Sequence, residues 1–538
     1  MNKKSNINRI LGISALFLCL GAGALSAQVE DKAENWTSYN RTIDGIRFSP
    51  LTQINPENVA NMKEVAAFDL GSDVNSFQTG ILAIDGKLYF STDTATYAIN
   101  GKTGKLIWKA TRKGGGSGYG ANRGLAYLNG RLFRGTSDGH VLAYNMKNGK
   151  LIWDVIPQGA TDPGKYFGMC PVAYDGKVFI GNGGGDNAGV IGSVYALDAS
   201  NGRMLWRFNT VPDAKENPKT STGLPVSGGG VWTTMSIDKE NGLLYASVGN
   251  PSPDFDVEFR GADRPYFNNV IALDINTGKV KGNQQVVKND AHDWDASAAP
   301  IIFTTKDNRK LVAEAGKNGL LTVMDGSKIA TTEDPAEALP FVYEVPTTTR
   351  INTDVRLSRE IYTYFKPGYM GGNEWNGPAF DPTRNLLFNG TDDWGVKMKL
   401  PSLEEAKKNI PAVGKEWFGA SDMIWDKADQ AKGWLKAFNA SDGSVKWSYH
   451  ATAPIVSGVT PTASGLLFTA AQNGDVYAFD SETGKLLWKG STGLMNAGGV
   501  ITYAIKGKQY VAVTAGLKSS LWTGVGASAK CKIVIYSL

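Results

Sequence analysis

The stretch YAFDSETGKLLW, residues 477–488, decides the fold, because variants of it recur along the chain. Each copy reads as an apolar strand, a turn rich in Asn, Asp and Gly, and a second strand that ends in Trp. The other clear copies are YAINGKTGKLIW (97–108), LAYNMKNGKLIW (142–153), YALDASNGRMLW (195–206) and LKAFNASDGSVKW (435–447). IALDINTGKVKG (271–282) lacks the Trp, and LLTVMDGSK (320–328) is a more degraded copy. The chain therefore repeats one strand-turn-strand unit.

The spacing of the copies indicates the architecture. Trp108 and Trp153 are 45 residues apart, Trp153 and Trp206 are 53 apart, and Trp447 and Trp488 are 41 apart. A period of roughly 40–50 residues with four strand-like runs is typical of a β-propeller. The Gly of each turn supplies the positive φ that a tight hairpin needs. We expect the terminal Trp of each copy to wedge between neighbouring blades.

The number of blades follows from the length of the chain. About 500 mature residues with a period in the middle forties give seven or eight blades, and we prefer eight because residues 283–434 leave room for further copies. The sequence thus predicts an all-β, eight-bladed β-propeller with four-stranded antiparallel blades and Trp-containing repeats. Residues 329–370 and 399–432 lack strand alternation and are predicted to be loops over one face, with a short helix at 403–409.

The first residues are typical of a secretory signal peptide. Three basic residues stand among the first nine, an apolar run follows at 10–20, and small residues lead to Ala27. This order predicts cleavage after Ala27 and a single propeller domain over residues 28–538. The apolar run is short for a membrane span, so an uncleaved anchor is the lesser alternative. We expect a soluble protein exported to the periplasm.

Charge and cysteine content exclude several classes of protein. The formal net charge is +5, and about +2 without the signal peptide, a balance that predicts neither nucleic-acid nor membrane binding. After cleavage only Cys170 and Cys531 remain, so no disulfide framework holds the fold. These two form either one long-range bridge or two separate buried thiols. His140, His292 and His450 are too scattered for a zinc site.

Three motifs point to one functional site. They are GGGVW (228–232), VGNPSP (248–253) and HDWDAS (292–297). Within them Trp232 would supply an aromatic slab, Asn250 an oxygen ligand and Asp295 a carboxylate. Together these residues suggest the floor, the metal ligand and the catalytic base of one pocket. Taken singly, Trp232 would more often be a core residue and Asn250 a turn residue.

Together with further motifs in the same order, these stretches resemble the pyrroloquinoline quinone (PQQ) dependent alcohol dehydrogenases, quinoproteins with an eight-bladed propeller. The further motifs are WTSYNRTIDGIRFSPLTQIN (36–55), ANRGLA (121–126), GKVFIGNGGG (176–185), GKNG (316–319) and GKQYVAVTAG (507–516). The resemblance covers essentially the whole mature chain. It implies PQQ as the cofactor and a calcium ion, Ca²⁺, beside it.

The resemblance also implies roles for individual residues at the metal. Asn250 matches a calcium ligand, and Trp232 matches the Trp beneath the planar cofactor. Asp295 matches the general base, which also lies at the metal, with Asp293 as the runner-up. The calcium Glu of the family is best matched by Asp186 in GGGDNAGV, whose side chain is shorter by a methylene.

Other matches concern the edge of the quinone. Arg123 and Lys317 match basic residues that contact it, and Trp394 in DDWG is expected to line the same face. A family Asn near the cofactor aligns with Glu374, or with Asn373 if the loop shifts. Gln78 and Gly168 fall near positions where many relatives carry a carboxylate and a hydroxyl contact; Gln78 is counted among the expected cofactor contacts.

The chain departs from the family pattern at several positions. Ser117 and Gly118 stand where many members have adjacent cysteines over the quinone. Ser297 stands where lanthanide-dependent relatives have a further Asp, which favours calcium. No C-x-x-C-H occurs in the sequence, so this chain cannot attach its own c-type haem. Electrons are expected to leave through a separate acceptor, a soluble cytochrome c in preference to a membrane quinone pool.

The sequence leaves two functions open. The first is a periplasmic, calcium- and PQQ-dependent dehydrogenase that oxidises a primary or secondary alcohol, with an aldehyde as the alternative substrate. The second is an exported, non-enzymatic propeller that binds other proteins or assists assembly. Retention of Trp232, Asn250, Asp295 and Arg123 favours the enzyme, because a scaffold has no evident need for this set. The missing cysteine pair and the altered Asp186 region favour a scaffold or a divergent specificity.

Overall fold

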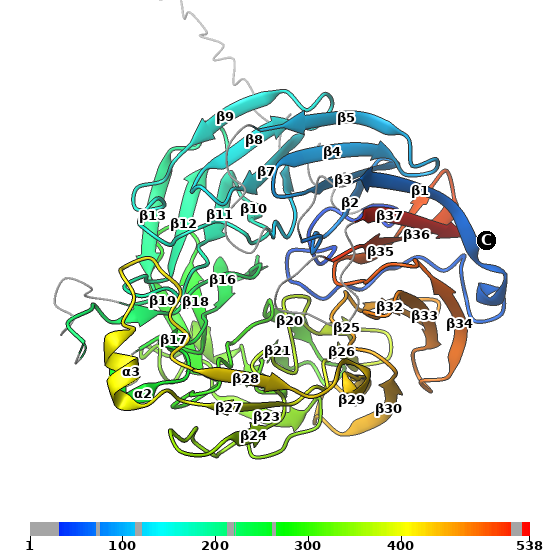
Figure 1. Cartoon of the computed structure of the whole chain (residues 1–538). Helices are drawn as coiled ribbons and strands as arrows, with labels where there is room; N and C mark the ends of the chain where they lie inside the picture. Colours follow the sequence, from blue (N-terminus) through cyan, green and yellow to red (C-terminus); the bar gives the residue numbers. More distant parts are fainter. Residues whose placement is uncertain are drawn as a thin grey trace, which may run out of the picture.

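The computed structural model describes residues 32–71, 76–112, 121–211, 220, 222–260, 265–517 and 530–538. In this part of the chain, eight four-stranded antiparallel sheets are arranged as blades around a central axis (Figure 1). The prediction of an eight-bladed propeller is confirmed. The predicted signal peptide, residues 1–27, lies outside the described residues.

Blades one to seven follow the order of the chain, and blade eight joins its two ends. Blade one contains β2–β5 (Leu82–Ile84, Lys87–Ser91, Ala95–Asn100, Leu106–Thr111), and blade two contains β6–β9 (Ala126–Leu128, Arg131–Gly135, Val141–Asn145, Leu151–Val155). Blade three contains β10–β13 (Val172–Tyr174, Lys177–Gly181, Ser193–Asp198, Met204–Asn209), and blade four contains β15, β16, β18 and β19 (Ser236–Asp238, Leu243–Ser247, Asn269–Asp274, Val280–Gln285). Blade five contains β20–β23 (Ile301–Thr304, Lys310–Ala315, Leu320–Asp325, Phe341–Pro346), and blade six contains β25, β26, β29 and β30 (Ala379–Asp381, Leu386–Gly390, Gly433–Asn439, Val445–Ala451). Blade seven contains β31–β34 (Thr460–Pro461, Leu466–Ala470, Asp475–Asp480, Leu486–Ser491). Blade eight contains β35–β37 (Val500–Ile505, Lys508–Ala515, Cys531–Ser537) and β1 (Lys63–Gly71).

The repeated turn has the same local chemistry that its residues predict. In the copy at 477–488, Oδ1 of Asp480 accepts hydrogen bonds from the backbone N–H groups of Glu482 (3.1 Å) and Thr483 (2.8 Å). Gly484 then adopts φ 72°, a conformation that side chains disfavour. Because an Asx turn followed by Gly closes the hairpin locally, short-range interactions pair the third and fourth strands in the blades that carry a clear copy of this turn.

The repeat Trp residues lie between blades, as expected. The indole N–H of each donates to a backbone carbonyl of the next blade, at the turn that follows its third strand or, for the last, just before β1. The pairs are Trp108 to Met146 (3.2 Å), Trp153 to Ala199 (3.2 Å), Trp206 to Ile275 (3.1 Å), Trp447 to Ser481 (3.0 Å) and Trp488 to Met62 (2.9 Å). In blade five Tyr343 takes this role and donates to Ala440 (2.8 Å). Each bond satisfies a buried carbonyl and fixes the position of the neighbouring blade.

Blade four shows what replaces the missing Trp. Gly282 pairs with Ala272, the register position that Trp108 occupies opposite Ala98 in blade one. A β-carbon built on Gly282 would lie 2.7 Å from Ile329 and 3.2 Å from Leu339. Side chains of the segment between β22 and β23 therefore fill the space of the indole.

Blade eight closes the ring. The first strand, β1, pairs with the last, β37, from Lys63 opposite Ser537 to Gly71 opposite Cys531. The two strands lie side by side in Figure 1, one blue and the other dark red. Closure of this kind leaves the ring with no free edge at its seam.

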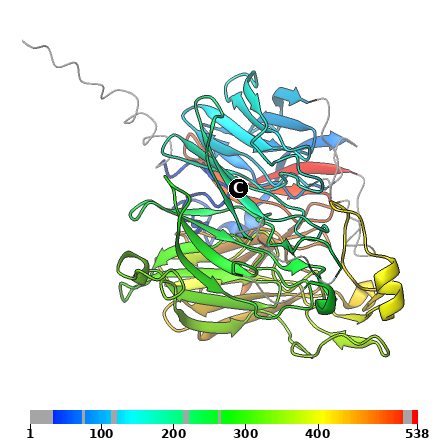
Figure 2. The same ribbon diagram turned by 90° about the vertical axis from the view of Figure 1, so that its left-hand side faces the viewer.

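The two predicted loop regions contain regular structure. Residues 341–346 form β23, the fourth strand of blade five, so the assignment of all of 329–370 to loops is wrong. The sequence did not indicate β23 because its apolar alternation is short and follows an insertion, and because Tyr343 replaces the repeat Trp. Three further strands, β24 (Thr363–Phe365), β27 (Val396–Lys399) and β28 (Asp422–Trp425), form a small sheet of their own. Figure 2 shows that the segment around residue 400 projects from one face of the ring.

The helix expected at 403–409 is confirmed as α3, Leu403–Lys408. A capping box starts it: the Ser402 hydroxyl accepts from the Glu405 N–H (3.2 Å), and the Glu405 carboxylate accepts from the Ser402 N–H (3.1 Å). The remaining short elements are η1 (Val59–Asn61), β14 (Ser227–Gly228), β17 (Pro251–Ser252), α2 (Val257–Arg260), η2 (Lys328–Ala330) and η3 (Ala428–Gln430).

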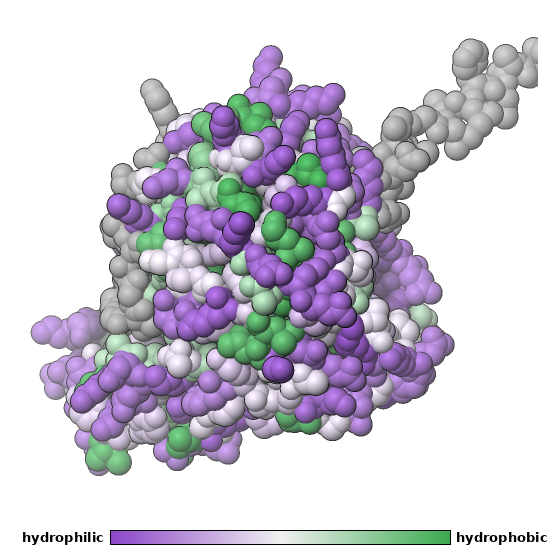
Figure 3. Space-filling model, turned by 90° about the vertical axis from the view of Figure 1, so that its right-hand side faces the viewer, coloured by the Kyte–Doolittle hydropathy of each residue, from purple (hydrophilic) through white to green (hydrophobic). Residues whose placement is uncertain are grey.

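The core lies between the blades, and the outermost strands also carry exposed aliphatic side chains such as Leu106 and Leu151. Buried aromatic and aliphatic side chains of successive sheets pack together, including Tyr195, Val178 and Leu244. On the side of the ring shown in Figure 3, hydrophobic groups are small and lie among hydrophilic side chains. Cys170 and Cys531 are both buried and unpaired, so the alternative of two separate thiols holds. Within the described ranges, every helix is too short or too polar to span a membrane.

Candidate active site

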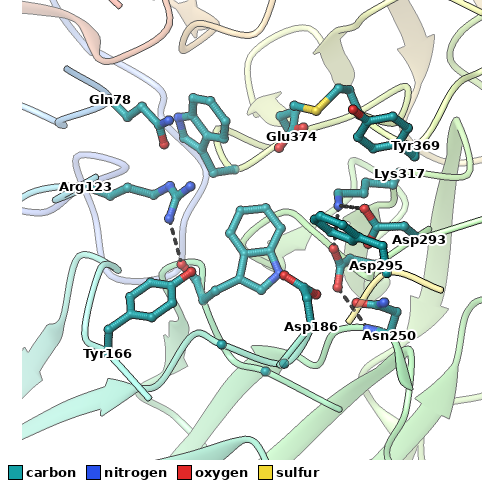
Figure 4. A pocket seen from close by; sticks show the side chains of 17 residues that line it. Gln78, Arg123, Tyr166, Asp186, Asn250, Asp293, Asp295, Lys317, Tyr369 and Glu374 are labelled. Carbon is teal, nitrogen blue, oxygen red and sulfur yellow. Dashed lines mark hydrogen bonds and ion pairs between the residues drawn. The ribbon is translucent and has the colours of Figure 1, made fainter. Parts of the chain in front are cut away.

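A pocket near the propeller axis collects most of the predicted site residues. It encloses about 790 Å³ of empty space, open mouth included, which lies in the range of roughly 300–1,000 Å³ typical of ligand sites. Figure 4 shows Arg123 and Tyr166 on one side of it and Lys317, Asp293, Asp295 and Asn250 on the other. The lining residues are Gln78, Arg123, Tyr166, Gly184, Gly185, Asp186, Gly230, Trp232, Asn250, Asp293, Asp295, Lys317, Tyr369, Met370, Glu374, Trp375 and Phe418.

A tight turn in HDWDAS aims two carboxylates at the pocket. The Asp290 carboxylate accepts hydrogen bonds from the backbone N–H groups of His292 (3.0 Å) and Trp294 (3.2 Å). The His292 and Trp294 rings stack on each other with centroids 4.3 Å apart. Asp293, in a left-handed conformation with φ 60°, and Asp295 line the pocket instead. Side chains along the turn thus alternate: His292 and Trp294 pack on each other, and Asp293 and Asp295 face the pocket.

Both oxygens of Asp295 have partners. Oδ1 accepts a hydrogen bond from the Asn250 backbone N–H (2.9 Å), and Oδ2 forms an ion pair with Nζ of Lys317 (2.8 Å). Lys317 also pairs with Oδ2 of Asp293 (3.2 Å). Burial by itself would lower the pKa of Lys317, but Asp293 and Asp295 outweigh it and raise that pKa well above its usual value. The ammonium is therefore a fixed positive charge between two carboxylates.

Asn250 connects two loops through its backbone and its side chain. While its N–H contacts Asp295, its side-chain amide Nδ2 donates to Oδ1 of Asp254 (2.9 Å). Asp254 is fully buried, directly behind the pocket lining. Its Oδ2 has no hydrogen-bond partner among the described residues. No sequence motif marked Asp254; the only signal was a carboxylate immediately after GNPSP.

Three acidic groups converge beside this amide. Asp186, Asp254 and Asp293 each place a carboxylate oxygen within 4.8 Å of the others. The Asp186 loop is held by its backbone carbonyl, which accepts from the N–H of Trp417 (2.9 Å) and the hydroxyl of Ser252 (3.4 Å). Burial raises the pKa of Asp186, and the Asp295 carboxylate raises it further. The cluster offers the oxygen donors that a hard cation prefers.

Cationic and aromatic groups form the other part of the pocket. The Arg123 guanidinium carbon lies 4.8 Å from the ring centroids of both Trp232 and Trp375. Arg123 also donates to the Trp232 carbonyl (3.3 Å), and Nζ of Lys317 lies 5.7 Å from the Trp232 ring. Because Trp232 is only half-buried, part of its indole faces the pocket. The arrangement combines a flat aromatic surface with positive charge over it.

Glu374 and Gln78 also reach the pocket (Figure 4). Burial raises the pKa of Glu374 to about 7, although Lys317 and Arg123 oppose the shift. Asn373, the alternative to Glu374, instead donates to the carbonyl of Gly316 (2.7 Å) below the lining. Gly168 contributes its carbonyl to the Arg123 N–H (2.9 Å) rather than a side-chain contact.

The structure does not bring every predicted residue to the pocket. Trp394 is buried outside the lining, where its ring stacks on Trp425 at 4.2 Å and its N–H donates to Asp426 (2.9 Å). The Ser297 hydroxyl is fully buried, with the carbonyls of Asn373 (3.0 Å) and Ala315 (3.3 Å) as alternative acceptors of its one hydrogen. Ser117 and Gly118 lie outside the described residues.

Several lining residues escaped the sequence analysis. Tyr166, Tyr369, Met370, Trp375 and Phe418 are apolar or aromatic and belong to none of the motifs; Trp375 directly follows Glu374. Phe418 comes from the insertion at 399–432, where its carbonyl accepts from the Phe255 N–H (2.9 Å). Burial raises the pKa of Tyr166, which keeps its hydroxyl protonated. These side chains supply the apolar and aromatic part of the pocket lining.

Comparison with known proteins gives a consistent result. The family model of the PQQ glucose/ethanol/alcohol dehydrogenase β-propeller domain matches residues 36–330 and 452–511. An alcohol dehydrogenase (quinone), dehydrogenase subunit, of Gluconacetobacter polyoxogenes is 30% identical over 94% of this chain and 74% of that protein. Quinoprotein alcohol dehydrogenase PedH of Pseudomonas putida is 27% identical over 90% and 86% of the two chains. A solved structure of a europium-containing methanol dehydrogenase has a TM-score of 0.82 at 22% identity, over 96% of this chain and 100% of that one, which supports the fold.

Proposed function

The chain belongs to the family of PQQ-dependent glucose, ethanol and alcohol dehydrogenases with a β-propeller domain, and on that premise we propose that it oxidises an alcohol with PQQ as the hydride acceptor. An aldehyde is the alternative substrate. Membership of this family makes the chain an oxidoreductase rather than the non-enzymatic scaffold considered above. The sequence resemblance is thus confirmed at the level of the family.

One observation carries the proposal: Trp232, Arg123, Lys317 and Asp295, which come from different blades or loops, line one pocket. The half-buried Trp232 ring offers a surface on which a planar cofactor can stack. Arg123 and Lys317 lie over that ring and supply fixed positive charge where an anionic cofactor needs it. The atoms Oε1 of Gln78 and Nε of Arg123 are buried without partners among the described residues, so polar groups are available to a ligand.

The bound quinone supplies a carbon that accepts hydride. In the proposal Asp295 takes the proton of the substrate hydroxyl, and Asp293 is the alternative base. Lys317 and the Asn250 N–H hold the Asp295 carboxylate in place. Tyr369, Met370 and Phe418 form the apolar part of the lining and limit the access of water.

We propose Ca²⁺ as the metal, for which the family pattern implies Asn250, Asp295 and Asp186 as ligands. The donors fit a hard cation because they are carboxylate and amide oxygens. Buried oxygens of Asp254 and Asp293 that lack partners among the described residues support a cation at this place. Its contribution would be to polarise the quinone and to balance the carboxylates.

The proposal places the protein in the periplasm and gives it a separate electron acceptor. The order of basic, apolar and small residues at 1–27 supports export. Since the sequence contains no C-x-x-C-H motif, this chain has no site for its own c-type haem. We propose a soluble cytochrome c as the acceptor.

The test is reconstitution of the purified protein with PQQ and Ca²⁺, followed by dye-linked oxidation of a panel of alcohols and aldehydes. Retained quinone absorption together with dye reduction would support the proposal, and the absence of both would refute it. Asp295→Asn should keep the quinone but lose roughly 10²–10⁴-fold in kcat, the usual contribution of a general base. Asp293→Asn is the matched variant. If it alone abolished turnover, the base would be Asp293.

A further inference from the structure

We infer that Asp254 is a cation ligand of this chain and that it acts together with Asp186 and Asp293. No motif marks Asp254 as a ligand, and the family pattern implies Asn250, Asp295 and Asp186 instead. The inference takes only the location of the site from the proposed function, because cation binding can be measured without quinone or alcohol.

The geometry suits a single ion. One carboxylate oxygen from each of Asp186, Asp254 and Asp293 lies within 4.8 Å of the other two. Oxygens bound to one Ca²⁺ at roughly 2.3–2.6 Å can be at most about 5 Å apart. The three oxygens can therefore reach the same cation with little movement.

Each of two buried acids keeps one oxygen for a ligand. Oδ1 of Asp254 accepts from Nδ2 of Asn250 (2.9 Å), and Oδ2 of Asp293 pairs with Lys317 (3.2 Å). The second oxygens, Oδ2 of Asp254 and Oδ1 of Asp293, have no hydrogen-bond partner in the described part of the chain. Asp254 is 0% and Asp293 6% exposed. A buried carboxylate oxygen with no donor is costly, and a cation between these side chains would satisfy both.

The expected ligands Asn250 and Asp295 are arranged differently. Both oxygens of Asp295 are engaged, by the Asn250 N–H and by Lys317. The amide nitrogen of Asn250 turns toward Asp254. Because Asp186 is one methylene shorter than the family Glu, a carboxylate from the adjacent loop can supply the lost reach. Asp254 would then bind the cation and leave Asp295 to the substrate proton.

The experiment is a cation titration of the full chain, purified without quinone and stripped with a chelator. Ca²⁺ is titrated by calorimetry, and Tb³⁺ by its tryptophan-sensitised emission with Ca²⁺ as the competitor. Asp254→Asn should weaken both cations by roughly tenfold or more, since the number of charged ligands sets affinity in calcium sites. Asp293→Asn should act in the same way. Replacing one of three crowded carboxylates by an amide should not lower the melting temperature of the cation-free protein.

Glu314→Gln is the matched control, because Glu314 is a buried acid of the same region with one unpartnered oxygen but lies outside the cluster. It should change cation affinity less than about threefold. Wild-type affinity in Asp254→Asn, with binding lost in Asp186→Asn, would overturn the inference and leave the family ligand set in place. Should Asp254→Asn not fold, unchanged affinity in Asp293→Asn would overturn it. Absence of cation binding in the wild-type chain would also overturn it, whereas quinone retention tests the proposed function separately.

Discussion

Gly249 leaves the space that the Asp295 carboxylate occupies. A β-carbon built on Gly249 would lie 2.2 Å from Oδ1 of Asp295, the atom that accepts the N–H of Asn250. The approach is closer than any van der Waals contact, so a side chain here must displace the carboxylate. The position of the proposed base thus depends on a glycine in a different loop, the one that follows β16.

Gly249→Ala is therefore expected to lower turnover more than it lowers stability. The displaced Asp295 would lose its bond to Asn250, and a misplaced base costs roughly 10²-fold in rate. Dye-linked kcat and the melting temperature measure the two effects. Gly326→Ala is the control, since Gly326 also packs closely, with Val312 at 3.1 Å from its built β-carbon, but lies at the end of β22 away from the pocket. Equal turnover in the two variants would contradict the prediction.

Restoring the repeat consensus in blade four should destabilise the protein. Gly282→Trp would place an indole where Ile329 and Leu339 already lie. Overpacking of a filled site costs about 1–3 kcal/mol. Denaturant unfolding would show a lower midpoint, and a variant as stable as the wild type would contradict the packing described here.

Cofactor binding should weaken as the pH rises through 7. Burial raises the pKa of Glu374 to about 7, so the side chain is largely neutral at pH 6 and ionised at pH 8.5. A new negative charge in the pocket repels PQQ, a tricarboxylate, by an amount worth roughly tenfold in affinity. Quenching of tryptophan fluorescence by PQQ at the two pH values measures the effect. Glu374→Gln should bind with similar affinity at both, and a dependence as steep as that of the wild type would exclude Glu374.

Stability should fall in alkaline solution because of Glu314. Burial raises the pKa of Glu314 to about 8 in the folded state, above its ordinary value near 4.5. The contribution of the neutral Glu314 side chain to the free energy of unfolding is therefore fully present below pH 4.5 and is lost as the pH rises through 8. Between pH 6 and pH 9, Glu314→Gln should gain in melting temperature relative to the wild type. The exposed Glu337→Gln should show no such gain.

The sequence predicts the blades well because their information is local. The Asx turn, the Gly and the terminal Trp lie within a dozen residues, as at 477–488, and they act through short-range bonds and one contact to the next blade. β23 escaped because its Trp is replaced by Tyr343 and an insertion separates it from β22. β23 belongs to blade five because it pairs with β22, and no local sequence pattern predicts this pairing.

The site was predictable where a motif fixed the backbone. Trp232, Asn250 and Asp295 follow Gly-rich or turn-forming stretches and reach the pocket as expected. Asp254 and Phe418 reach the site through tertiary contacts, the first behind the lining and the second from an insertion. Trp394 was predicted to line the pocket but does not, because its ring packs on Trp425, which belongs to the insertion at 399–432.

The pairing of β1 with β37 has a consequence for synthesis of the protein. No ribosome-bound chain can complete blade eight until residue 537 has emerged, so β1 waits unpaired while the other blades are made. An unpaired strand of nine residues is an edge that other chains can add to. The closed ring therefore requires that β1 be protected until the chain is complete, either by a chaperone or by delayed folding.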